Sequence, residues 1–109
     1  MAKLEKVLEG DFDVIIQNIE KGILSGSFSA TLEDSSDFQS EHSRCSVRVF
    51  ERYSAIGSNR VSLNITLFQE KGGAISLSAI TSGGSQAKFF KINTWGEEAF
   101  LQKLIEILS

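Results

Sequence analysis

Three stretches of the sequence decide the fold: residues 44–53 read RCSVRVFERY, residues 61–67 read VSLNITL and residues 75–79 read ISLSA. Apolar and polar side chains alternate in each of them, which is typical of a β-strand with one buried face. Glycine-containing connections separate the stretches, so the sequence predicts an antiparallel meander between residues 44 and 81. The side chains expected to face the core are Cys45, Val47, Val49, Tyr53, Val61, Leu63, Ile65, Leu67, Ile75, Leu77 and Ala79.

The lengths of the two turns follow from this alternation, because paired residues must point to the same face of the sheet. A three-residue loop at residues 71–73, with its two glycines, pairs Leu67 with Leu77 and Ile65 with Ala79. A two-residue turn there would set core side chains opposite solvent. The same reasoning at residues 56–58 predicts the pairs Tyr53–Val61, Val49–Ile65 and Val47–Leu67.

Amphipathic segments flank the meander. The first follows a predicted N-cap at Asp11 and ends near Gly22 and Gly26. Its apolar residues have the spacing of one helix face: Phe12, Ile15, Ile16, Ile19 and Ile23. The second has the same spacing at Leu101, Leu104, Ile105 and Leu108. Thr94 and Glu97 match a capping box in front of it, so a C-terminal helix is expected to begin there.

Less regular segments complete the chain. Residues 2–9 favour a short strand, and Phe28, Ala30 and Leu32 alternate with polar residues as in another strand. The polar, hydroxyl-rich residues 33–43 predict a loop, and residues 87–92 fit either a last strand or a packed connection. The expected fold is an α+β two-layer sandwich, with an antiparallel sheet of 4–6 strands and both helices on one face.

Composition limits the classes of function. The chain has 109 residues, 41% hydrophobic and 23% charged, as expected for one domain spanning residues 1–109. The sequence shows neither a membrane span nor a secretory signal, and its net charge of −3 argues against nucleic-acid binding. A single cysteine and a single histidine leave neither a disulfide framework nor a histidine-based metal cluster, so we expect a cytoplasmic protein without metal or cofactor.

Three motifs, EKGILSGS at residues 20–27, TSGGSQ at residues 81–86 and FFKINTWGEEAF at residues 89–100, resemble a family of short bacterial proteins. The family is found mainly in Firmicutes and is classed as a domain of unknown function. The resemblance covers nearly the whole chain. It implies a bacterial cytoplasmic protein, and it transfers no catalytic residue.

One candidate ligand site is the glycine-rich segment after the last meander strand. Consecutive backbone N–H groups at Ser82, Gly83, Gly84 and Ser85 could bind an anion, with Lys88 close behind. Together with Trp95, this segment could guard a pocket between the sheet and the C-terminal helix for a small anionic or amphipathic ligand. The spacing matches neither a Walker loop nor a dinucleotide fingerprint, and a loop that merely leaves the sheet needs the same glycines.

The second candidate site is the outward face of the sheet. Arg44, Arg48 and Arg52 share one parity with Phe50, and Phe68 and Ile80 are placed on the same outward side. Small polar residues surround them: Ser27, Ser29, Thr31, Ser46, Ser62, Asn64, Thr66, Ser76 and Ser78. Such a flat face can pack against a second copy, which predicts a homodimer with Arg48, Phe50, Arg52, Phe68 and Ile80 at its interface. A solvated sheet with internally paired arginines is the alternative.

Enzymatic chemistry has little support in the sequence. Cys45 is expected to be a small buried thiol, and His42 lies in the predicted loop, so a Cys–His pair is not favoured. There is no Gly-x-Ser-x-Gly elbow and no suitable pair of carboxylates. We therefore expect a non-enzymatic binding or interaction domain.

Overall fold

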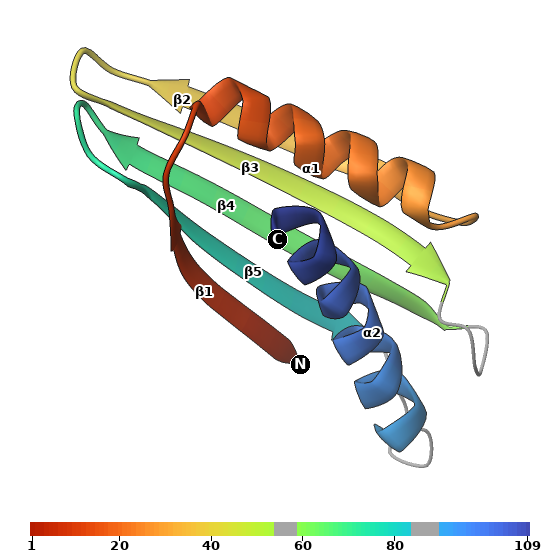
Figure 1. Ribbon diagram of the computed structural model, residues 1–109. Coiled ribbons are helices and arrows are strands. Elements are labelled where there is room, and N and C mark those ends of the chain that lie inside the picture. Colours follow the sequence, from red (N-terminus) through yellow and green to blue (C-terminus); the bar gives the residue numbers. More distant parts are fainter. Residues whose placement is uncertain (54–58, 84–89) are drawn as a thin grey trace.

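The computed structural model describes residues 1–53, 59–83 and 90–109, with the backbone alone at 90–95. Two helices lie on one side of a five-stranded antiparallel sheet (Figure 1). The elements are β1 (Ala2–Leu8), α1 (Phe12–Gly26), β2 (Thr31–Gln39), β3 (Ser43–Tyr53), β4 (Arg60–Glu70), β5 (Ile75–Gly83) and α2 (Phe90–Leu108). The strand order β1-β5-β4-β3-β2 places the N-terminal strand beside the last one. The α+β class, the antiparallel sheet and the two helices are confirmed.

The core lies between the sheet and the helices. From α1 it takes Phe12, Ile16, Ile19 and Ile23, and from α2 Phe100, Leu101 and Leu104. From the sheet it takes Phe50, Val61, Leu63, Ile65, Leu67, Ile75, Leu77 and Ala79. The predicted N-cap is also confirmed, because the Val14 N–H donates to Oδ1 of Asp11 at 3.0 Å. Residues 2–8 form the predicted strand.

The register between β4 and β5 agrees with the prediction. Leu67 pairs with Leu77, and Ile65 pairs with Ala79. The turn between them needs a glycine, since Gly72 has a φ of +77° and side chains rarely tolerate that conformation. The glycine-containing turn and the buried alternation therefore specify the same pairing.

The predicted orientation of β3 is wrong. Arg52, not Tyr53, pairs with Val61, and the one-residue shift exchanges the two faces of the strand. Phe50 is fully buried beneath the helices, and Ser46 and Arg48 are also buried. Cys45, Val47 and Val49 face away from the helices and are half-buried. The proposed turn at residues 56–58 lies outside the described residues.

The prediction for residues 28–43, which precede the meander, is also partly wrong. The predicted loop at residues 33–43 is largely strand β2, whereas Phe28 precedes that strand and is fully exposed. β2 is an edge strand whose residues are all exposed, so its polar side chains need not be desolvated when it pairs with β3.

The start of the second helix differs as well. Helix α2 begins at Phe90, so Thr94 is not its N-cap and residues 90–92 are helical. Glu97 does not complete a capping box; its carboxylate is buried and contacts the Met1 ammonium at 2.9 Å. Residues 87–89 lie outside the described part of the chain.

The helices cross at Gly22, where they come too close for a side chain. A Cβ on this glycine would lie 2.7 Å from Cδ1 and Cγ1 of Ile107. Ile107 is branched and packed against the core, so it cannot easily move away. Gly22 therefore leaves the space that the Ile107 side chain of α2 occupies against α1.

Replacing Gly22 with alanine tests this crossing. We expect Gly22→Ala to lower the free energy of unfolding in urea by about 1–2 kcal/mol, because the clash outweighs alanine's better helix propensity. Gly26→Ala is the matched control, since its Cβ would meet only the flexible stem of Lys103. Equal effects of the two substitutions would contradict the close approach at Gly22.

The orientation of β3 can be tested with two phenylalanines of opposite faces. Phe50→Ala should cost about 3–5 kcal/mol of unfolding free energy, because it leaves a cavity in the core. Phe68→Ala should cost less than about 1 kcal/mol at low protein concentration, because its ring is 41% exposed. If Phe50→Ala cost as little as Phe68→Ala in a urea titration, β3 would have the orientation first predicted from the sequence, in which both rings face outward.

Candidate functional site

The sheet surface opposite the helices is the largest candidate site. We call it the open face. Its side chains form rows across all five strands, and the first row runs through Val7, Ser76, Phe68, Cys45 and Phe38. The next two rows are Glu5-Ser78-Thr66-Val47-Ser36 and Lys3-Ile80-Asn64-Val49-Asp34. No helix covers these rows in the part of the chain that the structure describes (Figure 1).

In the three rows just named, charge is confined to the edge strands; Glu51 and Arg60 also face this side but lie beyond these rows. In these three rows the central strands β3, β4 and β5 carry only apolar, hydroxyl, thiol or amide side chains. Lys3 and Glu5 lie on the edge strand β1, and Asp34 lies on the opposite edge strand β2. A shallow hollow of about 400 Å³ lies around Val7, Phe68 and Ser76. The open face therefore has an uncharged centre and a charged rim.

The structure divides the predicted interface residues between the two sides of the sheet. Phe68 and Ile80 do lie on the open face, 41% and 40% exposed. The placement of Arg48, Phe50 and Arg52 there is wrong, because the inner side of β3 carries all three. Sequence reasoning missed Cys45 and Phe38 as open-face residues. Both errors follow from the reversed faces of β3 and the polar composition of β2.

The inner side of β3 carries three arginines, which we call the arginine row: Arg44, Arg48 and Arg52. Arg44 forms two hydrogen bonds with Asp13 of α1, at 2.8 and 3.2 Å, and its guanidinium lies over the Phe12 ring. Arg44 is therefore paired within the chain, as the alternative to the interface prediction proposed. Its contacts hold α1 against the end of β3.

Arg48 is the most extensively bonded member of the arginine row. Its Nε donates to Glu20 of α1 at 2.7 Å, and its Nη2 lies 3.0 Å from Asp37 of β2. It also donates to the Ser36 and Val47 carbonyl oxygens. One buried guanidinium therefore joins α1, β2 and β3 and satisfies two carboxylates at once.

These bonds change the acidity of the carboxyl groups. A hydrogen bond from the Ser46 hydroxyl at 2.6 Å, followed by the bond from Arg48, holds the pKa of Asp37 below its usual range. The hydrogen bonds from Arg44 lower the pKa of Asp13 in the same way. Both carboxylates are thus stabilised in their charged form.

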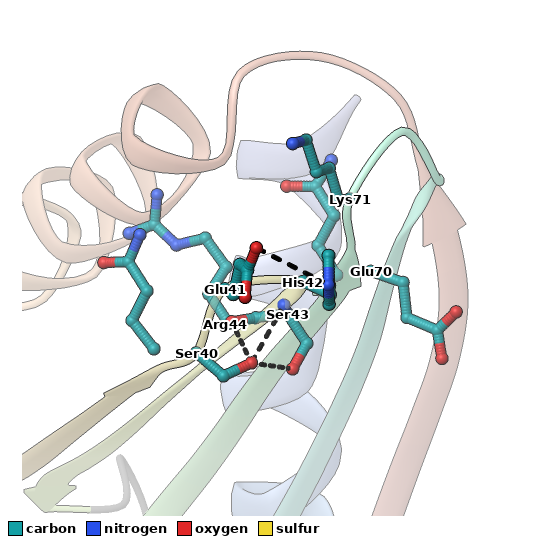
Figure 2. A pocket seen from close by; sticks show the side chains of 9 residues that line it. Ser40, Glu41, His42, Ser43, Arg44, Glu70 and Lys71 are labelled. Atoms are coloured by element: carbon teal, nitrogen blue, oxygen red, sulfur yellow. Dashed lines mark hydrogen bonds and ion pairs between the residues drawn. The ribbon is translucent and has the colours of Figure 1, made fainter.

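A small hollow of about 170 Å³ lies where the β2–β3 and β4–β5 hairpin tips meet. Figure 2 shows the Ser40 hydroxyl bonded to Ser43 and the His42 ring beside Glu41. The Nε2 atom of His42 lies 3.9 Å from Oε1 of Glu41. The Lys71 N–H donates to the His42 carbonyl oxygen and ties the two tips together. The bonds of Ser40 and Lys71 close and join turns, so we assign this hollow a structural role.

The predicted anion-binding segment is only partly described. Ser82 and Gly83 end strand β5, and the Ser82 hydroxyl bonds to that of Ser62 at 2.7 Å on the open face. Gly84, Ser85 and Lys88 lie outside the described residues, as does the side chain of Trp95 in α2. The described residues therefore do not test a pocket formed by these six residues, and that site stays a prediction.

No group of three or more metal-ligating side chains gathers within residues 1–53, 59–83 and 90–109. Over the same residues, neither helix has the length and apolar content needed to cross a bilayer.

The acidity of Asp37 provides a test of the Arg48 cluster. Ser46→Ala should raise the carboxyl pKa of Asp37 toward its usual value of about 3.9, as followed by NMR titration of the side chain. Because the folded-state pKa is depressed, this carboxylate stabilises the fold above about pH 4, and the stabilisation is lost as the pH falls through the folded pKa. Ser36→Ala, on the other side of β2, should leave the titration unchanged. An unshifted midpoint in Ser46→Ala would show that the hydroxyl is not responsible.

Comparison with known proteins gives a family and no activity. No curated protein matches the chain. The model of a family of unknown function, DUF6054, matches residues 1–109. The chain therefore belongs to the DUF6054 family.

Proposed function

We propose that this chain is a non-enzymatic interaction domain that forms a homodimer, with the open face of one copy packed against the open face of another. The observation that carries the proposal is the exposed apolar row of Val7, Phe68 and Phe38, on a surface whose centre is uncharged. Protein interfaces have this distribution, with charges depleted at the centre and present at the rim.

The open face is self-complementary about a two-fold axis. The middle strand of the sheet is β4. An axis parallel to β4 and lying between the two sheets sets β1 of one copy over β2 of the other, and β5 over β3. Phe68 then meets Phe68 of the second copy, and Val7 meets Phe38. In the third row, Ile80 meets Val49.

The same arrangement matches the charges. Lys3 on β1 and Asp34 on β2 occupy the same row, at opposite edges of the sheet. The two-fold axis therefore places Lys3 of one copy opposite Asp34 of the other, twice in each dimer. Opposite charges at the rim favour this orientation over a rotated one.

The size of the open face suits a modest interface. Beyond the three rows of the open face, a fourth follows at Ser82-Ser62-Glu51-Thr31. Five strands about 4.8 Å apart and these four rows cover about 20 by 25 Å, or about 500 Å² per copy in projection. The smallest stable interfaces bury about 600 Å² per partner, and side-chain relief adds to the projected area. We therefore expect a dimer that forms at micromolar concentrations.

Light scattering after size exclusion tests the dimer. Wild-type protein at about 50 µM should have the mass of two chains. Phe68→Asp should have the mass of one, because it places two carboxylates together at the centre of the interface. Phe28→Asp is the control, since Phe28 is fully exposed and lies outside the sheet. A wild-type monomer at this concentration would refute the proposal.

Charge reversal tests the orientation. Lys3→Glu alone should weaken the dimer, because it opposes two carboxylates, and Lys3→Glu with Asp34→Lys should restore it. The reactivity of the single thiol, Cys45, should fall as dimer forms, since Cys45 lies in the first row. Failure of the double substitution to restore the dimer would contradict the axis along β4.

The second candidate function is that of a carrier for a small anionic or amphipathic ligand, which would bind between the sheet and α2. The observation that favours it is Arg52, a half-buried cation with no carboxylate partner among the described residues.

For both candidate functions we propose a bacterial cytoplasmic protein that binds neither nucleic acid nor membrane. The family resemblance, the net charge and the single cysteine support this proposal.

A further inference from the structure

The arginine row and the acids of α1 follow matching repeats. Arg44, Arg48 and Arg52 are four residues apart on β3, which is about 13 Å along a strand. Their partners Asp13 and Glu20 are seven residues apart on α1, which is about 10.5 Å along a helix. Each arginine step on the strand is therefore accompanied by two turns of helix.

The repeat stops before the third arginine. Seven residues beyond Glu20 is Ser27, which is not acidic and lies just after the last residue of α1. No ion pair joins Arg52 to a carboxylate within the described part of the chain. The helix therefore supplies acids for two arginines of the row and ends before it could supply one for Arg52.

Arg52 is nevertheless held in place. Its guanidinium lies over the Phe100 ring of α2, with Cζ 4.4 Å from the ring centroid. Burial lowers the pKa of this guanidinium, as desolvation does for a cation that no anion compensates. The ring covers one face of the guanidinium, while its N–H groups form no hydrogen bond to a described residue.

The acidic residues near Arg52 form ion pairs with other groups. Glu97 of α2 contacts the Met1 ammonium at 2.9 Å. Glu51 and Glu33 approach Arg60, at 2.7 and 3.4 Å, on the other side of the sheet. None of these carboxylates is within ion-pair distance of Arg52.

A second cation lies at the same end of α1. Lys103 follows Phe100 by one helical turn on α2, and its stem packs against Gly26, the last residue of α1. Among the described residues, its ammonium has one acidic neighbour, Glu106, at 3.8 Å. Arg52 and Lys103 therefore border the place where the next acid of α1 would stand.

We propose that Arg52 and Lys103 bind the carboxylate or phosphate group of a small ligand at the C-terminal end of α1, in the place of the missing third acid. The N–H edge of Arg52 presents two parallel donors, which suits a planar or tetrahedral oxyanion. The Phe100 ring keeps these donors oriented before the ligand arrives. The site gives the second candidate function its location, and it does not depend on the homodimer, since the open face is on the other side of the sheet.

Binding is tested by NMR titration with two probes, sodium acetate and inorganic phosphate, at constant ionic strength and pH 7. We expect saturable shifts of the Arg52 Nε–Hε and Phe100 backbone resonances, and the tighter probe identifies the preferred oxyanion. Arg52→Gln should weaken binding at least about tenfold, and Lys103→Gln by a smaller factor. Arg60→Gln is the matched control, because Arg60 is paired with acids on the open face. Absence of saturation with both probes, or unchanged binding in Arg52→Gln, would overturn the proposal.

Stability of the unliganded protein gives a second measurement. Arg52→Met keeps the apolar stem and removes an uncompensated cation, so the urea midpoint should stay the same or rise. Arg48→Met should lower the midpoint, because it leaves Glu20 and Asp37 without their cation. A comparable loss in both variants would mean that Arg52 has an internal anionic partner. The Phe68→Asp variant can be titrated in the same way, so a failed dimer does not obscure the result for the anion site.

Discussion

The buried guanidinium of Arg48 determines how the two layers of this protein fit together. It bonds to Glu20 on α1 and to Asp37 on β2 while its own backbone belongs to β3. Removing an acidic partner is costly, because the Arg48 charge stays buried and loses part of its compensation. Because the Arg48 side chain points toward the helices, every second residue of β3 must point the same way and the residues between them must face outward. Phe50 then enters the core, and Cys45, Val47 and Val49 face outward.

The orientation of β4 and β5 was predictable because only one assignment of the buried face fits their alternating sequences. In β4 and β5, branched aliphatic residues alternate with serine, threonine and asparagine, so one face alone could be buried. In β3 both faces are plausible, because valines occupy one and an aromatic ring with three long arginine stems occupies the other. Arginine can bury its stem while its charge is paired, so polarity alone assigns the wrong face. The spacing of Asp13 and Glu20 on α1 was the signal that could have identified their partners.

The errors at β2 and α2 have a different origin. β2 contains serines and acids that predict a loop, and its strand conformation comes from pairing with β3 along an exposed edge. The capping-box pattern at Thr94 satisfies a local rule, but the helix is already formed there and Glu97 contacts Met1, far away in the sequence. Within the candidate sites, Phe68 and Ile80 could be placed from β4 and β5. Cys45, Phe38 and the inward arginines could not.

The sheet separates two surfaces of different chemistry. One side is flat and uncharged at its centre, which suits a large contact with another protein surface. The other side carries the arginine row of β3. Acids of α1 compensate the charges of Arg44 and Arg48, and α1 ends before it reaches Arg52. Because five strands lie between these surfaces, occupation of one leaves the other accessible. A dimer in which each copy binds its own anion is therefore geometrically consistent.

The pairing of β1 with β5 has a consequence for how the chain is made. Ala2 bonds to Thr81, 79 residues later in the sequence. At about 5–20 residues per second, the ribosome completes this partner about 4–16 s after it has made the first strand. During that interval β1 has no neighbour in the sheet. Lys3, Glu5 and Lys6 then act as gatekeepers, because their charges keep Leu4, Val7 and Leu8 from associating with other nascent chains.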